Sequence, residues 1–336
     1  MISKTYQGEE WKALRRRFNP GFAPQHLMTL LPSIMDKASI FLNRLDDLAR
    51  TGETFSLQGL ATNLTFDVIG SLVLDIDMTT YAERSKSTKP RSILSISLQD
   101  IKDLSPETVD VTCDQLSSFL FAGHDTTSTT IAWMFYELSR TPHALRAVRA
   151  ELDDLLGPDA SPAAVAARLL APGGEQIVHP VILRLWPPGA TARMTKPGDG
   201  LKVTLRTSSN PTGETSAVDL GGLLLYHIHS IIQRDPSIFG ETADTFIQHD
   251  TADKIPAGAW RAFERGPRNC IGQELATIEA RVVIALVARR YDFTKVGIGA
   301  VSLDSATGEP ELGKNGQYKV SEEMYMALAN AIAIVL

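Results

Sequence analysis

One cysteine of this chain lies in a loop whose composition suits the binding of a metal ion by a thiolate. In the stretch FERGPRNCIG, Cys270 follows Gly266 by four residues and precedes Gly272 by two. Glycine allows positive φ and a close approach of the backbone, so backbone N–H groups can point at the sulfur. Such hydrogen bonds weaken the negative charge of a thiolate and tune the redox potential of the metal it binds. The loop therefore predicts a metal site with Cys270 as the ligand.

Two further side chains of this loop suit a bound cofactor. Arg268 is long enough to reach a cofactor carboxylate, and Phe263 is expected to pack beside the sulfur and exclude water. All five fixed positions of the pattern F-x-x-G-x-R-x-C-x-G are present. In this the chain resembles the cytochrome P450 family, whose haem iron is held by a cysteine thiolate. The alternative is an ordinary buried cysteine in a loop rich in glycine and proline.

A second motif lies in an apolar stretch, residues 115–138, which predicts a mostly buried helix of about six turns. Its middle contains Gly123, Asp125 and Thr126. In a buried helix glycine costs about 1 kcal/mol relative to alanine, and an unpaired carboxylate costs more. Such violations tend to mark functional sites. Taken alone, the motif is equally consistent with a kinked helix whose hydroxyls bond their own backbone.

The same stretch resembles the A-G-x-D-T-T helix that crosses the haem in P450s. The resemblance implies that Asp125 supplies protons and that Thr126 donates a hydrogen bond to bound oxygen. It also implies that Gly123 leaves room for dioxygen and permits a local π-type widening of the helix.

Cationic groups near the start of the chain extend the resemblance. Trp11 and Arg15 are four residues apart, so they share a helix face and can reach one ligand. They resemble the W-x-x-x-R helix that holds a haem propionate, and the resemblance adds Arg268 and Arg193 to the propionate-binding set. The alternative for the three consecutive arginines that begin at Arg15 is a solvated face or a docking patch for an acidic partner.

The chain departs from the family where an E-x-x-R helix is expected. Arg184 fits the arginine, but Val181 occupies the glutamate position, and a short deletion explains the mismatch. The P-E-R segment expected after Phe246, with its own arginine, is also missing. Removing one partner of a buried ion pair costs about 3–5 kcal/mol. We therefore expect Arg184 to be a buried cation without its carboxylate, either because the gene model has lost pieces or because the protein is degenerate.

Composition and charge narrow the class of protein. The chain has 336 residues, of which 43% are hydrophobic, enough for one large core or two smaller ones. A net charge of −6 argues against nucleic acid as a partner. Cys113 and Cys270 are the two cysteines, so no disulfide framework is implied, and a reducing compartment is expected.

The predicted fold class is mainly α with minor β, a P450 fold incomplete at its N-terminus. We expect one domain spanning 1–336, with early helices in 1–78, a polar linker in 79–110 and a haem-binding core in 111–336. Hydrophobic periodicity and turn residues predict the following finer divisions: helices over 9–74, the central helix and its successor to 156, a loop rich in Gly, Ala and Pro to 174, short strands within 203–225, a loop over 256–266, and a helix over 273–291 whose dipole favours the thiolate.

The resemblance implies a fungal-type haem-thiolate monooxygenase that inserts one atom of O2 into a small lipophilic substrate of secondary metabolism. Haem b would be the cofactor, and NADPH-cytochrome P450 reductase would supply the electrons. The alternatives are a truncated, inactive P450-like protein and a binding module without haem. Because no anchor opens the chain, membrane association is not expected and a cytoplasmic location is. A full-length anchored form would lie on the cytosolic face of the endoplasmic reticulum.

Overall fold

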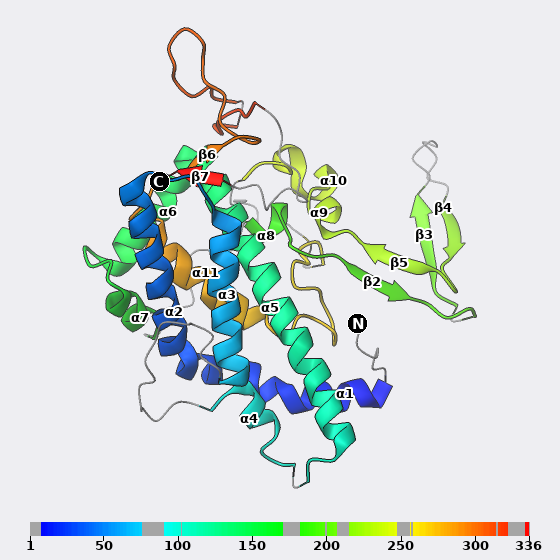
Figure 1. Cartoon of the computed structure of the whole chain (residues 1–336). Coiled ribbons are helices and arrows are strands. Elements are labelled where there is room, and N and C mark those ends of the chain that lie inside the picture. Colours follow the sequence, from blue (N-terminus) through cyan, green and yellow to red (C-terminus); the bar gives the residue numbers. More distant parts are fainter. Residues whose placement is uncertain are drawn as a thin grey trace.

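The computed structural model describes residues 8–75, 91–101, 103–170, 182–198, 200–206, 215–246, 256, 258–313, 315–321 and 333–335. The helices, in chain order, are α1 (Gly8–Phe18), α2 (Pro24–Thr51), α3 (Leu57–Leu74), α4 (Ile93–Ser97), α5 (Pro106–Arg140), α6 (Pro142–Leu156), α7 (Pro162–Leu170), α8 (Ile182–Leu185), α9 (His229–Ile232), α10 (Pro236–Phe239) and α11 (Gln273–Val287), with 3₁₀ turns η1 (Asn19–Phe22) and η3 (Gly240–Thr242). The strands are β1 (Phe55–Ser56), β2 (Thr191–Met194), β3 (Lys202–Arg206), β4 (Thr215–Asp219), β5 (Leu224–His227), β6 (Thr294–Val296) and β7 (Ala333–Val335). The predicted class, mainly α with minor β, is confirmed (Figure 1).

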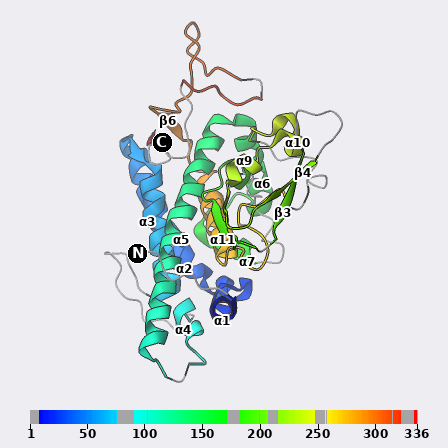
Figure 2. The ribbon, with the colours of Figure 1, turned by 90° about the vertical axis from the view of Figure 1, so that its right-hand side faces the viewer.

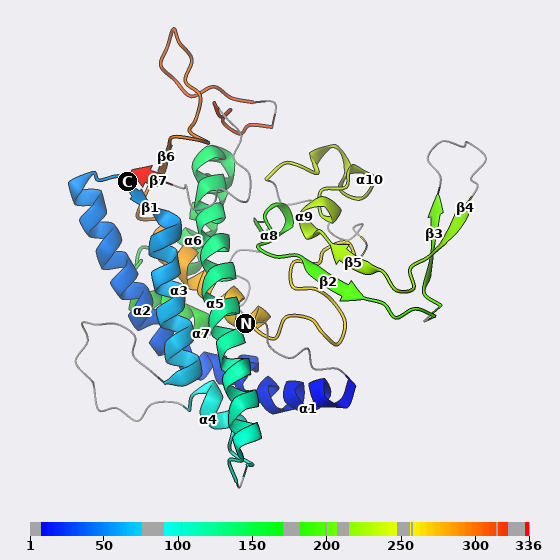
Figure 3. The same ribbon diagram turned by 45° about the vertical axis from the view of Figure 1, so that its right-hand side comes forward.

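The core lies between long helices. Helices α2, α3, α5 and α11 pack together and bury one continuous apolar cluster (Figure 3). The most extensive contact joins α3 to α5, and at Gly123 an added Cβ would lie 2.7 Å from the Ile69 side chain. The absence of a side chain at Gly123 therefore sets how closely the two helices approach.

Helix α5 is longer and less buried than its sequence pattern predicts. It begins at Pro106, where the Ser105 hydroxyl accepts a hydrogen bond of 3.2 Å from the Thr108 N–H and caps the helix. The half from Thr127 onward is largely buried, whereas the half before it is partly exposed, with Phe121 67% accessible. The helix is α-helical throughout, so the expected π-type widening at Gly123 is wrong.

Two segments predicted to be irregular contain helices. Within the expected polar linker, α4 begins at the cap residue Ser92 and buries Ile93 against Gly21. Within the expected loop after α6, α7 buries Val165 and Leu169, which are four residues apart on one face. Serine at a cap and alanine within a helix are favourable, so a polar or small-residue composition concealed both helices. Residues 76–90, 102 and 171–174 of these segments lie outside the described part.

Three small antiparallel sheets accompany the helices, in the orders β1-β7-β6, β2-β5 and β3-β4. Strand β2, which the sequence analysis did not predict, pairs with β5 so that Met194 faces Leu224 and Thr191 faces His227. The β2–β5 and β3–β4 sheets lie on the side of α5 opposite α3 (Figure 2). Of these four strands, β2 contributes Thr191 to the lining of the cavity beside α5.

Within the described residues, α3 is also long and apolar enough to cross a membrane, judged by length and composition alone. Its apolar residues serve a different purpose here, because α3 packs between α2 and α5 and contributes Leu64, Val68 and Leu72 to the core. Its composition is that of a core helix.

The close approach at Gly123 can be tested by substitution. Gly123→Ala is expected to lower the free energy of unfolding by about 1–3 kcal/mol, because the overpacking against Ile69 exceeds the gain in helix propensity of about 1 kcal/mol. Urea denaturation followed by circular dichroism measures the change. In an Ile69→Ala background the same substitution should be neutral or stabilising, since the obstructing atoms are gone. An equal loss in both backgrounds would contradict this account of the α3–α5 contact.

Candidate active site

A cavity of about 590 Å³ lies between α5, the start of α11 and the loop that carries Cys270. Most of its lining is apolar, including Phe22, Ile69 and Leu275. The residues predicted from sequence to act together meet on its wall: Gly123 and Thr126 from α5, and Phe263, Arg268, Cys270 and Gly272 from the cysteine loop. Two motifs that are about 140 positions apart in the sequence are thus brought to one enclosed space by the fold.

The cysteine loop is closed by its own backbone. The Cys270 N–H donates to the Phe263 carbonyl at 2.9 Å, and the Asn269 N–H donates to the Gly266 carbonyl at 3.1 Å. Gly266 has a φ of 82°, the left-handed conformation that the sequence analysis assigned to it. Gly272 has an ordinary φ of −87°, and an added Cβ would lie 3.9 Å from the sulfur, so its contribution is a backbone N–H.

That N–H is directed at the thiol. Cys270 is exposed on the cavity wall, but the protein around the cavity shields it from bulk water, so burial raises its pKa above the ordinary value. The hydrogen bond from the Gly272 N–H and the charge of Arg15 act in the opposite direction. Both groups stabilise a thiolate, as does the N-terminus of α11, which begins three residues after Cys270.

Trp11 and Arg15 of α1 reach this loop, as their spacing predicts. Arg15 donates to the Asn269 carbonyl at 2.8 Å and to the Asn269 side chain at 3.0 Å, and the Arg268 guanidinium lies over the Trp11 ring at 4.3 Å. Arg193 of β2 does not join these three side chains. It donates to the neighbouring Ala192 carbonyl and does not line the cavity.

In the polar motif of α5, a hydroxyl bonds the backbone of its own helix, as the alternative interpretation of the sequence predicts. The Thr126 hydroxyl donates to the Ala122 carbonyl one turn earlier, at 2.7 Å, while Thr126 also lines the cavity. Asp125 was expected to be buried, but it is exposed and does not line the cavity. The half of α5 on which it lies is only partly covered by other described elements, so its carboxylate keeps its hydration.

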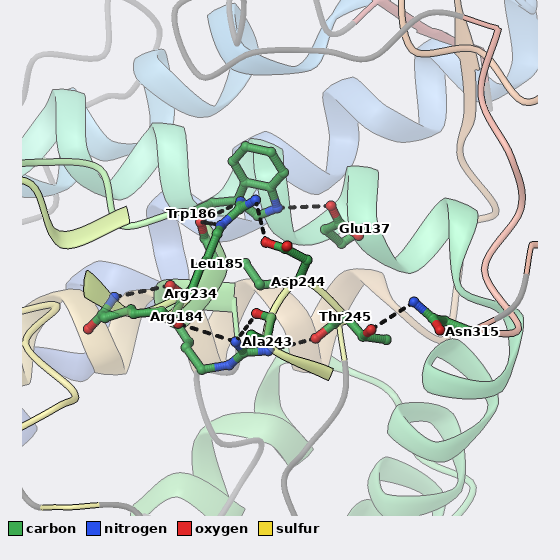
Figure 4. A network of polar contacts seen from close by, with 10 residues as sticks. Glu137, Arg184, Leu185, Trp186, Arg234, Ala243, Asp244, Thr245 and Asn315 are labelled. Carbon is green, nitrogen blue, oxygen red and sulfur yellow. Dashed lines mark hydrogen bonds and ion pairs between the residues drawn. The ribbon is translucent and has the colours of Figure 1, made fainter. Parts of the chain in front are cut away.

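Behind the cavity, Arg184 of α8 is a buried cation held by backbone oxygens (Figure 4). It donates to the carbonyls of Gln233, Ala243 and Thr245 at 2.5–3.3 Å, and it stacks over Phe239. Burial lowers its pKa to about 10, and the charge of Arg234 adds to this effect. Val181 and the residues after Phe246, to which the sequence analysis assigned the missing partners, lie outside the described part. Among the described residues, three carbonyl groups thus take the place of the carboxylate that an E-x-x-R pattern would supply.

A carboxylate from another element ties α8 to α5. Glu137 of α5 accepts a 2.8 Å hydrogen bond from the Trp186 indole and a 3.0 Å bond from Gln317. Trp186 stacks on Trp133 with ring centroids 3.8 Å apart. The Arg234 guanidinium lies 4.3 Å from the centre of the Trp186 ring (Figure 4). Burial raises the pKa of Glu137, whereas Arg140 and these hydrogen bonds oppose the rise. The network supports the wall of the cavity formed by Ile182 and Leu183.

One polar cluster was not predicted from the sequence: Glu264, Thr191 and His229 form a polar corner of the cavity, and His227 contacts Glu264 from β5. One Glu264 oxygen accepts from the Thr191 hydroxyl and lies 3.3 Å from the His227 Nδ1 and from the His229 Nε2. Burial alone would raise the pKa of Glu264, but these hydrogen bonds and one from the Arg265 N–H lower it to about 2. The backbone of Glu264 has a positive φ of 57°, which is unusual for a residue with a Cβ. No feature of the local sequence predicts this conformation.

A second missed residue is Glu279 of α11. It lines the same cavity and is buried, on a helix whose other buried residues are all apolar. Burial raises the pKa of this carboxyl well above its ordinary value, which favours its neutral form.

The lowered pKa of Glu264 predicts a specific pH dependence of stability. Its folded pKa of about 2 lies below the ordinary 4.5, so its stabilising effect is complete above pH 4.5 and is lost as the pH falls toward 2. The difference in unfolding free energy between the parent protein and Glu264→Gln should be constant from pH 5 to 8 and shrink below pH 4.5. Urea titrations at each pH measure it. A difference that does not vary with pH would show that Glu264 is not a stabilised carboxylate.

The carbonyl cage predicts that Arg184 stabilises the fold without a carboxylate. Arg184→Met should lower the unfolding free energy by about 2–4 kcal/mol, because buried carbonyl groups lose their donors. Arg234→Met is the control, since Arg234 is partly exposed and its ion pair with Asp244 reaches a largely exposed carboxylate; its loss should be smaller. Denaturant midpoints compare the two. An increase in stability for Arg184→Met would mean that burying the charge costs more than its hydrogen bonds contribute.

Comparison with known proteins agrees with this site. The model of the family described as cytochrome P450 matches residues 3–89, 81–170 and 222–301. The cytochrome P450 monooxygenase acrF of Aspergillus aculeatus is 28% identical over 84% of this chain and 72% of its own length. The cytochrome P450 monooxygenase polC of Polytolypa hystricis is 25% identical over 93% and 68%. A bifunctional cytochrome P450/NADPH--P450 reductase of Gibberella moniliformis is 31% identical over 57% of this chain and 16% of its own length. The chain is thus a fungal-type monooxygenase sequence by similarity, and it belongs to the cytochrome P450 family.

Proposed function

We propose that this protein is a haem-thiolate monooxygenase that oxidises a small lipophilic substrate, with Cys270 as the iron ligand. The observation that carries the proposal is the position of the Cys270 thiol: it is exposed on a largely apolar cavity, receives a hydrogen bond from the Gly272 N–H, and shares that cavity with Gly123 and Thr126 of α5. A thiolate held in this way opposite a polar break in an apolar helix suits oxygen chemistry at a haem iron.

The residues present fit a haem. Cys270 offers the axial ligand from a loop that is already closed by the hydrogen bond to Phe263, and Arg15, Arg268 and Trp11 gather on one side of that loop as candidate partners for the propionates. Arg193 remains a candidate only if its side chain leaves the Ala192 carbonyl. Haem bound there would supply the activation of dioxygen with electrons from outside the chain.

The chain's own groups then have separate roles. Phe263 and the other apolar residues of the lining exclude water and favour a lipophilic substrate. The Thr126 hydroxyl can exchange its bond to the Ala122 carbonyl for one to a group in the cavity, and exposed Asp125 can take up protons from solvent one residue away.

The relatives also support proposals for electron supply, location and pathway. The bifunctional relative of Gibberella moniliformis combines a P450 with a reductase in its name, which supports NADPH-cytochrome P450 reductase as the electron source for this chain. The fungal relatives support a role in secondary metabolism, and the family supports association with the endoplasmic reticulum.

A second candidate function is a P450-like protein that binds haem or a partner without turnover. It is favoured by Arg184, which lacks a carboxylate partner among the described residues. The carbonyl cage and the Glu137 network weaken this alternative, because they stabilise the region behind the cavity by other means.

The reduced carbon monoxide difference spectrum of the purified chain tests the proposal. A Soret band at the position of thiolate ligation is expected for the parent protein and for Cys113→Ser, because Cys113 is exposed on α5 away from the cavity lining. Cys270→Ser should lose this band. Retention of the band in Cys270→Ser, or failure of the folded parent to bind haem, would contradict the assignment of Cys270. Haem binding with the thiolate band but no turnover with reductase would favour the inactive alternative.

A further inference from the structure

The polar corner of the cavity joins the cysteine loop to the small β2–β5 sheet. Glu264 belongs to the loop, Thr191 begins β2, His227 ends β5, and His229 begins α9. All three partners direct a polar hydrogen or ring nitrogen to the same Glu264 oxygen, and the other oxygen accepts from the Arg265 N–H at 3.2 Å. Each imidazole can donate a ring N–H to the carboxylate, since either tautomer is available to it.

This arrangement is not a metal site. Two histidines and a carboxylate often hold metal ions, but here both rings approach one carboxylate oxygen that is already an acceptor from Thr191. Among the described residues, no group of three or more His, Cys, Asp or Glu side chains is placed to hold a metal. The carboxylate is therefore the acceptor of the cluster, and its partners are the donors.

The backbone of Glu264 explains why it needs these partners. Its φ of 57° lies in the left-handed region, which is unfavourable for a residue with a Cβ and persists only when the surroundings impose it. The Glu264 side chain is 9% exposed, so its hydrogen bonds are largely shielded from water. The interactions with β2, β5 and α9 thus impose the turn at Glu264.

The turn at Glu264 is connected directly to the thiol. The preceding residue, Phe263, provides the carbonyl that accepts the Cys270 N–H at 2.9 Å, and the Glu264 N–H donates to the Arg261 carbonyl at 2.9 Å. Any rotation of the backbone at Glu264 would move the Phe263 carbonyl and break the bond that closes the loop. The position of the Cys270 sulfur therefore depends on the Glu264 side chain.

We propose that Glu264 is a positioning residue that fixes the Cys270 loop to the β2–β5 sheet and α9, and so holds the thiol in place at the cavity wall. Its importance for catalysis rests on the proposed function, but its effect on the thiol is a property of the chain without haem. Thr191, His227 and His229 act through Glu264, and they do not contact the sulfur in the geometry described.

The test uses the haem-free full chain carrying Cys113→Ser, so that Cys270 is the one thiol present. The rate of alkylation of Cys270 by iodoacetamide is measured at pH 8. Glu264→Gly permits the left-handed backbone but removes the carboxylate. Because the hydrogen bond from the Cys270 N–H to the Phe263 carbonyl holds the thiol against the cavity wall, a freed loop should make the thiol more accessible and react about three- to tenfold faster.

Two further variants should give alkylation rates between those of the parent and Glu264→Gly. Glu264→Gln keeps an acceptor oxygen for Thr191 and the imidazoles, so it should restore part of the slow reaction. Thr191→Val removes one donor and should give a smaller increase than Glu264→Gly. Glu241→Gln is the matched control, because Glu241 is exposed in η3 and outside the cavity lining; it should react like the Cys113→Ser parent. Circular dichroism verifies that each variant is folded.

The outcomes separate this inference from the proposed function. If folded Glu264→Gly reacts at the parental rate, or if Glu241→Gln changes the rate as much, the inference is wrong. If Glu264→Gly does not fold, unchanged alkylation rates in both Glu264→Gln and Thr191→Val overturn it. With haem added, the same variants should show a smaller thiolate-type Soret fraction than the parent. Absence of haem binding by the parent would count against the proposed function and leave the alkylation result to decide on Glu264.

Discussion

The structure depends on how closely α5 packs against α3. Helix α5 carries a wall of the cavity on one side and contacts α3 on the other, and Gly123 belongs to both because it lines the cavity and lies against Ile69. A residue with a side chain there would push the two helices apart and displace the α5 wall of the cavity relative to the cysteine loop. The glycine that the P450 resemblance assigns to dioxygen thus has a packing role as well, and the two roles constrain the same position.

The buried charges near the cavity show how the fold stabilises Arg184 without the glutamate of an E-x-x-R pattern among the described residues. A lone buried cation is costly, and Arg184 is tolerated because three carbonyl groups from the chain around α9 and η3 surround its guanidinium. The carboxylate that anchors α8 comes from Glu137 of α5, through Trp186. Hydrogen bonds to neutral dipoles and a carboxylate from a different helix together hold the region that an Arg–Glu pair holds in the family pattern.

Some elements could be read from local sequence and others could not. The cysteine loop, α5, α11 and the α1 pair Trp11 and Arg15 follow from fixed motifs and helical spacing, and their mutual approach is confirmed by the contacts of Arg15 and Arg268. Helices α4 and α7 were missed because a serine cap and a run of alanines resemble a loop in composition. The exposure of Asp125 was missed because burial depends on which elements cover a helix, and periodicity does not report that.

The sequence by itself determined the chemistry available: a single thiolate between glycines, an interrupted apolar helix and a cationic pair near the start of the chain, each recognisable because it depends on residues only a few positions apart. Only the tertiary structure decided which groups surround that thiolate. Glu264, Thr191, His227 and His229 come from four separate elements, and Glu279 and Glu137 acquire raised pKa values through burial by distant residues. Interactions of this kind depend on distances in space, which the order of residues does not encode locally.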